Sequence, residues 1–305
     1  MKTTTLAAGI MAASLLLASW LFANKKISTR KVEGKKNAFE TYWYDGKAEV
    51  CSYDLEQNRY GEIRKGDAIL IFVTEDFSKT KQVKLDRPEM ATKDAVKILK
   101  LNMSREFRTG IYPYHLMSSV FTTVEKPKTI KASYSVQEWC GHTFLQFSRR
   151  DDAYKVNGNS YFEKEVDTDT LLRSVLLEDE IWTLLRIDAN LIKKGVQDII
   201  PSGITSRLIH EAPQLKKGEI IMSSAINENE GTSFLEMVIG TRHLKIEYEK
   251  TFPHSILGWQ EYSEDGGKHT LVSRAKLKKK VRIPYWQLNH EADNGWRDSL
   301  LLRIK

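Results

Sequence analysis

The segment KASYSVQEWCGHTFLQFS at residues 131–148 decides the fold class of this protein. Over residues 131–138, small or apolar side chains alternate with polar ones, and a second run with two phenylalanines follows over residues 142–148. Alternation with period two is typical of a β-strand that buries one face. Gly141 supplies a turn between the runs, so the segment is predicted to form an antiparallel hairpin.

The same pattern recurs on both sides of this hairpin. Strand-like runs cover residues 47–55, 67–74, 219–224, 233–239, 244–249 and 271–283. Turn signals separate several of them, including Asp45-Gly46, placed between a ring-rich run at residues 42–44 and the first of these runs, and Gly266-Gly267. The sequence therefore predicts a mainly β protein, with one large antiparallel curved sheet or two partial barrels. Curved sheets of this kind can hold apolar ligands.

One segment breaks the alternation. Leu171, Leu172, Val175 and Leu176 follow the 3.6-residue spacing of a helix, and Thr168 or Asp169 is placed to cap it. A short helical segment is predicted over residues 169–187. It lies in a helical bridge of residues 166–203, between β-rich halves at residues 39–165 and 204–305 that could also form one continuous domain.

The N-terminus has the pattern of a secretory signal peptide over residues 1–23. Lys2 precedes an apolar stretch at residues 6–23, and small residues near Ala23 suit cleavage. An uncleaved anchor is the alternative, because about 18–20 apolar residues just span a bilayer. Residues 24–38 are basic and polar, which predicts a flexible leader. We expect a protein of the periplasm or outer membrane, membrane-peripheral at most after cleavage.

Composition narrows the classes of protein and partner. The 305 residues include 47 Lys+Arg against 40 Asp+Glu, and only 2 Cys, which excludes collagen-like, disordered and disulfide-dense chains. Nucleic acid is the usual partner of a basic chain, but export removes it. Lipid headgroups, glycan or another anionic envelope component remain as partners. A net charge of this size also serves solubility alone.

Several blocks resemble a known family when taken together. They are residues 42–49 (YWYDGKAE), 73–78 (VTEDFS), 136–142 (VQEWCGH) and 177–182 (LEDEIW). With these blocks, the chain is similar to a family of uncharacterised exported bacterial proteins, whose members are sometimes labelled septum formation inhibitors. The nucleotide-pyrophosphatase motifs that this label implies are absent from the sequence, so the resemblance implies export and no catalytic residues.

Cys140 and His142 are the weak candidates for chemistry, because a thiolate beside an imidazole is the minimum of a nucleophilic pair. A disulfide between Cys51 and Cys140 is the main competitor, since these are the only two cysteines and export leads to an oxidising compartment. Two buried or inert thiols are the third possibility.

Candidate ligand-binding residues form two groups. A basic stripe is expected on one side of the last long strand, beside two aromatic rings, and Tyr112-Pro113-Tyr114 could line a ligand mouth. The residues are Tyr112, Tyr114, Lys276, Lys278, Lys280, Arg282, Tyr285 and Trp286. Such a stripe suits an anionic surface, although lysines on an exposed strand also prevent edge-to-edge association. Most rings of this kind belong to a core instead.

Metal and cofactor chemistry find no support in the sequence. The seven histidines lack the H-E-x-x-H spacing, and Glu178-Asp179-Glu180 is interpreted as the solvated start of a helix. The leading hypothesis is a non-enzymatic binding or scaffolding protein for an apolar or anionic envelope component. A Cys-dependent hydrolase or thiol enzyme and a structural subunit of an envelope assembly are the alternatives.

Overall fold

A computed structural model describes residue 34, residues 38–224 and residues 231–302. The expected signal peptide and most of the leader lie outside the described residues. The chain divides into two compact units after Asp45. In the first unit, residues 38–43 are helical, so the prediction that Asp45-Gly46 is a hairpin turn between two strands is wrong. Phe39 and Trp43 are four residues apart, and their rings meet with centroids 6.3 Å apart, as neighbours on one helix face do.

The second unit is built from strands, which confirms the mainly β fold class. The strands that the structure describes are β1 (Ala48–Arg59), β2 (Glu62–Ser78), β3 (Ala95–Thr109), β4 (Tyr112–Thr123), β5 (Thr129–Glu138), β6 (Gly141–Arg150), β7 (Ala153–Ser160), β8 (Thr168–Arg173), β9 (Leu176–Leu177), β10 (Gly195–Ile200), β11 (Lys216–Ser224), β12 (Thr232–Ile239), β13 (Arg242–Glu249), β14 (Ile256–Asp265) and β15 (Lys268–Ile283). Its α-helices are α2 (Glu180–Asp188), α3 (Gly203–Leu208) and α4 (Gly295–Ser299).

All of these strands belong to one sheet, ordered β8-β7-β6-β5-β4-β3-β2-β1-β15-β14-β13-β12-β11-β10-β9. Neighbours pair antiparallel except β9 and β10, which are parallel. The strands at the two ends of this order, β8 and β9, are joined through Ser174 and Val175 alone, which reach about 11 Å at most. Arg173 of β8 also forms an ion pair with Asp198 of β10. The sheet therefore curls until its edges meet, without pairing them.

The helical segment is shorter than the sequence predicts. Thr168–Arg173 forms strand β8, which pairs with β7, and the helix α2 begins only at Glu180. Leu171 and Leu172 are adjacent apolar residues that fit either period over so short a run, and pairing with β7 decides for the strand. The Asn157-Gly158 pair is a dipeptide typical of tight turns, but it lies within β7.

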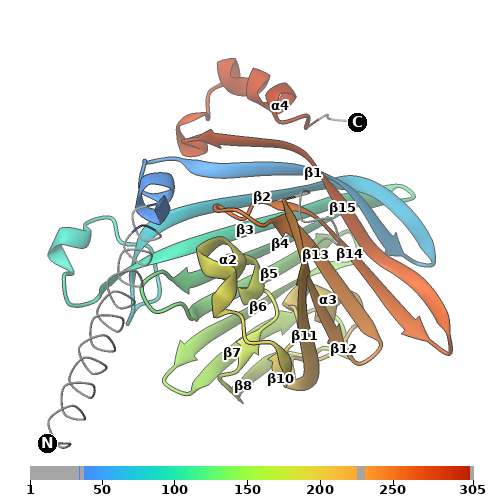
Figure 1. Ribbon diagram of the computed structural model, residues 1–305. Helices are drawn as coiled ribbons and strands as arrows, with labels where there is room; N and C mark the ends of the chain where they lie inside the picture. The colour runs from blue at the N-terminus through green and yellow to red at the C-terminus, as the bar shows by residue number, and fades with distance from the viewer. Residues whose placement is uncertain (1–33, 35–37, 225–230, 303–305) are drawn as a thin grey trace, which may run out of the picture. The chain divides into compact units, whose positions relative to one another are not determined.

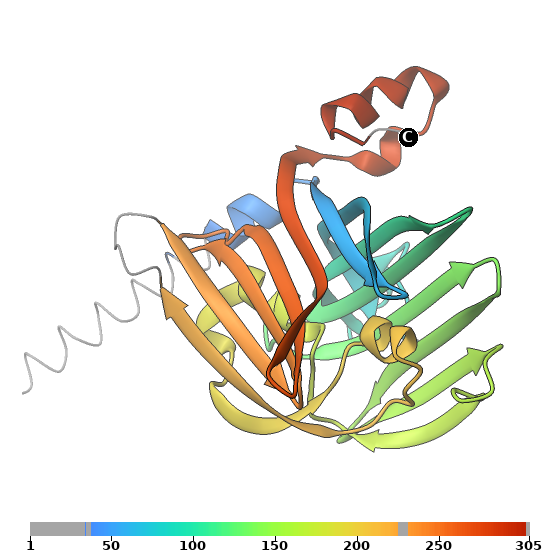
Figure 2. The same cartoon turned by 90° about the vertical axis from the view of Figure 1, so that its right-hand side faces the viewer.

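The two faces of the sheet are covered by different segments. Helices α2 and α3 lie inside its curve (Figure 1), and a view turned by 90° shows the C-terminal segment outside it (Figure 2). On the outer side, Ala48 and Val50 of β1 join Leu300 and Leu302 in one apolar cluster. The Ser52 hydroxyl donates to the carbonyl of Leu300 at 2.5 Å, which ties the C-terminal segment to β1.

Candidate functional site

The candidate site lies where four connections between strands meet, at an end of the sheet that we call the hairpin end. The β1–β2 turn holds Tyr60, the β3–β4 turn Ile111, and the β5–β6 turn Trp139. Alternate hairpins of an antiparallel sheet turn at the same end, so these tips are neighbours. The β7–β8 connection, residues 161–167, completes the group.

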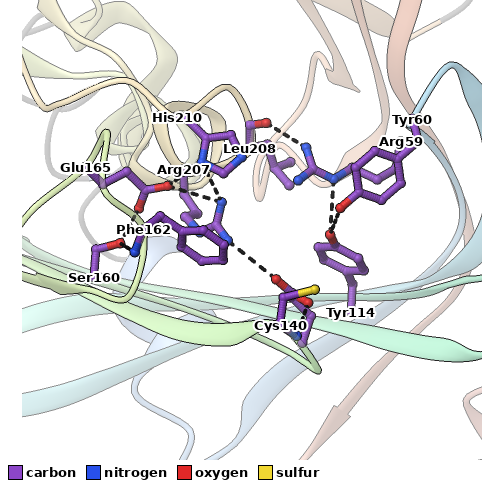
Figure 3. Close-up of polar contacts among 11 residues, drawn as sticks. Arg59, Tyr60, Tyr114, Cys140, Ser160, Phe162, Glu165, Arg207, Leu208 and His210 are labelled. Carbon is purple, nitrogen blue, oxygen red and sulfur yellow. Dashed lines mark hydrogen bonds and ion pairs between the residues drawn. The ribbon is translucent and has the colours of Figure 1, made fainter.

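Tyr114 forms the inner wall of the hairpin end. Its side chain is fully buried on β4, and its hydroxyl lies 2.8 Å from that of Tyr60 (Figure 3). Arg59 donates to this hydroxyl through Nε at 3.3 Å and to the carbonyl of Leu208 at 2.7 Å. The arginine therefore ties the β1–β2 turn to the end of α3. The ring of Tyr114 stacks on Phe107, with centroids 4.9 Å apart.

Arg207 of α3 holds the opposite wall together. Its guanidinium lies 3.7 Å from Glu138 of β5, 3.2 Å from Glu165 and 4.0 Å above the ring of Phe162 (Figure 3). Glu165 is also 2.7 Å from Nδ1 of His210 and accepts a hydrogen bond from Ser160 at 2.8 Å. These contacts fix the 161–167 connection against α3.

Proton affinities at the hairpin end follow from burial and these contacts. Burial, with the hydrogen bond that Tyr114 shares with Tyr60, raises the pKa of Tyr114. Burial alone would also raise the pKa of Tyr60, but its hydrogen bonds with Tyr114 and Tyr112 and the nearby Arg59 outweigh burial and lower it. Burial lowers the pKa of Arg207 in spite of Glu165.

Four aromatic side chains line the open side of the site, and we call Tyr60, Tyr112, Trp139 and Tyr161 the aromatic platform. Tyr60, Trp139 and Tyr161 are 60%, 68% and 74% exposed, which is unusual for rings of this size. Tyr112 and Trp139 stack with centroids 6.1 Å apart and planes 26° apart. Tyr161 lies against Gly141, where an added Cβ would come within 2.9 Å of its ring.

A small cavity lies between β5, β6, β7 and α3, and one of its lining residues, Ser160, is the chain neighbour of Tyr161 in the platform. Its volume is about 40 Å³, and its walls include Phe144, Ser160, Glu165 and Arg207. A water molecule needs roughly 10–15 Å³ by this measure, so the cavity holds about three waters. Pockets for whole small-molecule ligands measure roughly 300–1,000 Å³. The cavity can therefore take only a substituent of a larger ligand.

The space inside the curve of the sheet is filled by side chains around α2. Trp182 of α2 meets Trp259 of β14 edge-to-face, with centroids 5.4 Å apart, and Tyr53 of β1 lies 5.3 Å from the same ring. All three side chains are at most 2% exposed. Packing of this kind leaves the expected container for apolar ligands occupied by the protein's own core at α2.

The acidic start of α2 lies within this interior, so the expected solvated helix start is wrong. Glu178, Asp179 and Glu180 are 3%, 6% and 6% exposed. Glu178 pairs with Arg242 of β13, and Glu180 accepts from the backbone of Thr129 at 3.0 Å. Burial and the neighbouring Glu178 raise the pKa of Asp179 to about 6, and burial raises the pKa of Glu180 to about 7. Sequence alone does not reveal that the chain turns inward here.

The two cysteines are free and far apart, which contradicts the expected disulfide. Cys51 is buried on β1, whereas Cys140 is exposed in the turn after β5. Four strand steps separate β1 from β5 in the sheet, roughly 19 Å at about 4.8 Å each, and a disulfide needs Cα atoms within about 7 Å.

Cys140 also lacks the features of a nucleophile. A hydrogen bond with Glu138, and the charge of that carboxylate, raise the pKa of the Cys140 thiol, whereas catalysis requires it lowered. His142 pairs with Gln137 across the β5–β6 ladder and is exposed. The thiol-enzyme alternative therefore gains no support.

The basic stripe does not share one face of β15. Ser52 pairs with Lys279 while Tyr53 pairs with Leu277, so Lys278 is an extra residue that interrupts the alternation. The side chains divide between the faces: Lys276 and Lys278 lie on the outer face, and Lys280 and Arg282 on the α2 side, opposite Cys51 and Glu49.

Two of these lysines already have partners, and the flanking rings differ. Lys278 donates to Asp67 at 2.5 Å, and Lys280 to Ser255 at 2.7 Å. Tyr285 packs against the outer apolar cluster, and Trp286 is 44% exposed. Their role in binding an anionic component stays a prediction.

Of the residues at the hairpin end, the sequence singles out Tyr112 and Tyr114, whose role in binding stays a prediction, and gives no signal for Arg59, Glu165 and Arg207. Only folding brings these three together, because α3 reaches the site from the far end of the sheet order. The exposed rings had a local signal, since Tyr60 and Trp139 each stand at or next to a glycine-containing turn. Within the described ranges, no three His, Cys, Asp or Glu side chains are arranged to hold a metal ion. No helix in these ranges is long and apolar enough to cross a bilayer.

Comparison with solved structures gives a distant likeness. No family model and no curated protein matches the chain. A solved structure described as a beta-barrel-like protein of domain of unknown function DUF1849 from Brucella abortus aligns with 77% of this chain and 98% of its own, at 7% identity and a TM-score of 0.46. This likeness is too distant to carry an argument. The resemblance to exported bacterial proteins stays a prediction, and no comparison bears on the septum-formation label.

Proposed function

We propose that this protein is a non-enzymatic, exported binding protein that engages a component of the bacterial envelope at its hairpin end. The aromatic platform is the observation that carries the proposal. Soluble proteins rarely leave several large rings exposed side by side unless that surface meets a partner. Because core side chains fill the α2 side of the sheet, we expect the ligand to bind at the exposed rings of the hairpin end.

A binding role fits the chemistry of the site better than a reaction does. Arg59 and Arg207 are engaged by protein groups that hold the turns in place. The pKa of Cys140 is raised, and the hydroxyls of Tyr60 and Tyr114 are hydrogen-bonded to each other. Rigid rings on fixed hairpins form a preorganised contact surface, which reduces the entropy lost on binding.

The test is retention of the purified protein on bacterial envelope material. Replacing two platform rings, Trp139→Ala with Tyr161→Ala, is expected to abolish retention. Trp296→Ala is the matched control, since it removes an exposed ring from α4 on the C-terminal segment. Equal retention of the platform variant and the native protein contradicts the proposal. If Trp286→Ala or Lys276→Glu abolishes retention instead, the ligand binds at β15.

A further inference from the structure

We infer that the ligand of the hairpin end is an uncharged saccharide chain whose rings stack on Trp139 and Tyr161. This inference rests on the proposed function and names the class of its ligand. Three observations carry it: the way the two rings are held, the charge around them, and the small cavity beside them.

Each of the two rings is supported from behind. Trp139 stacks on Tyr112 at a shallow angle of 26°, and Tyr161 rests on the backbone at Gly141. Both are nevertheless at least 68% exposed, so one face of each is covered and the rest is open. A supported ring with an open face is suited to stacking against another ring, such as the C–H face of a sugar. Rings that enter a bilayer need no such support, because lipid surrounds them.

Charge around the two rings disfavours an anionic ligand. Around the two rings, the carboxylates Glu138, Glu163, Glu165 and Asp167 stand against the cations Arg59, Lys164 and Arg207. The cations are outnumbered, and Arg59 and Arg207 are already engaged by protein groups, which disfavours an acidic polymer or an anionic lipid headgroup. The exposed carboxylates of Glu163 and Asp167 are also strong acceptors for the hydroxyl groups of a neutral sugar.

The cavity suits a side group of a sugar ring. Ser160 lines it and directly precedes Tyr161, and Glu165 supplies a carboxylate to its wall. Room for about three water molecules admits a hydroxymethyl arm, which has two non-hydrogen atoms. The aliphatic side chains of its wall, such as Val136 and Leu145, contact its carbon, while the polar groups serve its hydroxyl. A lipid tail has no such polar group to place there.

The experiment measures binding of the full chain to defined probes by calorimetry and sedimentation. The probes are uncharged hexasaccharides of glucose and of N-acetylglucosamine, an oligogalacturonate hexamer, and phosphatidylcholine vesicles with and without phosphatidylglycerol. At least one uncharged hexasaccharide is expected to bind, and Trp139→Ala or Tyr161→Ala to weaken it about tenfold or more. Trp139→Phe is expected to restore most of the affinity, and Trp296→Ala to leave it unchanged.

The outcomes separate the two levels of proposal. Binding of oligogalacturonate or vesicles that is lost in Trp139→Ala, with no binding of either uncharged hexasaccharide, overturns the saccharide inference and keeps the proposed function. Absence of platform-dependent binding to every probe also overturns the inference. The proposed function then stands or falls by retention on envelope material. Near-ultraviolet circular dichroism of each variant checks that a loss of binding is not a loss of fold.

Discussion

Helices α2 and α3 both lie inside the curve of the sheet, and each carries an arginine that faces glutamate. Arg186 of α2 donates two hydrogen bonds to Glu49, at 2.5 and 2.7 Å, and both side chains are 0% exposed. Arg207 of α3 meets Glu138 and Glu165 at 3.7 and 3.2 Å, with Glu165 11% exposed.

The two regions contain the same residue types and differ in how far other side chains enclose them. The pair on α2 is sealed among core rings, since the Arg186 guanidinium lies 4.7 Å above Phe72 and donates to the carbonyl of Pro253 at 2.8 Å. The cluster on α3 borders exposed rings and a cavity. The α2 pair therefore maintains the fold, whereas the α3 cluster shapes a surface.

Breaking the α2 pair is expected to have the largest effect. Arg186→Met removes the guanidinium that donates two hydrogen bonds to the buried Glu49, and loss of one partner of a buried pair costs about 3–5 kcal/mol in the free energy of unfolding. Urea denaturation at neutral pH measures this change. The double variant Glu49→Leu with Arg186→Met is expected to recover most of it, because no uncompensated charge remains. A loss below about 1 kcal/mol in the single variant contradicts the enclosure described here.

Stability is expected to fall as pH rises from about 4.5 to 7, because of the carboxylates at the start of α2. Glu180 has a pKa of about 7 in the folded protein, raised mainly by burial, against an ordinary 4.5. Between these values the folded state binds more protons than the unfolded state, so the free energy of unfolding decreases with pH. The effect of Glu180 is on the order of 3 kcal/mol. Asp179 adds a decrease in the same direction up to about pH 6.

Urea denaturation at several pH values measures this slope, and Glu180→Gln is expected to flatten it. The glutamine amide oxygen can still accept from the backbone of Thr129. Glu163→Gln, at an exposed position, is the matched control and is expected to leave the slope unchanged. An unaltered slope in Glu180→Gln would mean that Glu180 titrates as an exposed carboxylate.

The success of sequence reasoning also differs between the two regions. Alternation predicts β5 and β6, since a strand with one buried face repeats every two residues over residues 131–138 and 142–148. The contents of the interior follow no local pattern. Arg186 and Glu49 are 137 positions apart, and their pairing depends on the chain turning inward after β9. The extra residue at Lys278 has no local signal either, so the expected stripe divides between two faces.

Breaking the α3 cluster is expected to have a smaller effect on stability and a larger one on binding. Arg207→Met removes the cation beside Glu138 and Glu165, but both carboxylates keep other partners: Glu138 accepts from the backbone of Cys140, and Glu165 stays in contact with His210 and Ser160. The expected loss is about 1–2 kcal/mol in the free energy of unfolding. Envelope retention should weaken as well, because Arg207 holds the connection that carries Tyr161. If Arg207→Met lowers the free energy of unfolding as much as Arg186→Met does, both arginines maintain the fold, and the contrast between the two regions is wrong.

Changes at the cysteines are expected to have the smallest effect on stability. One cysteine lies in each region, so their reactivities compare the two regions directly. Cys51 lies beside the α2 pair, where its thiol donates to Glu49 at 3.4 Å and burial raises its pKa. Cys140 stands exposed at the hairpin end. Cys140→Ser is expected to change the free energy of unfolding by less than about 0.5 kcal/mol, as surface substitutions do.

Iodoacetamide should modify one thiol in the native protein, slowly because the pKa of Cys140 is raised, and both thiols in urea. Peptide mapping then locates the native modification at Cys140 if the interior is sealed as described. Modification of Cys51 at a similar rate would show that the α2 region opens as readily as the hairpin end, and two protected thiols joined in one peptide would mean that strands β1 and β5 are neighbours.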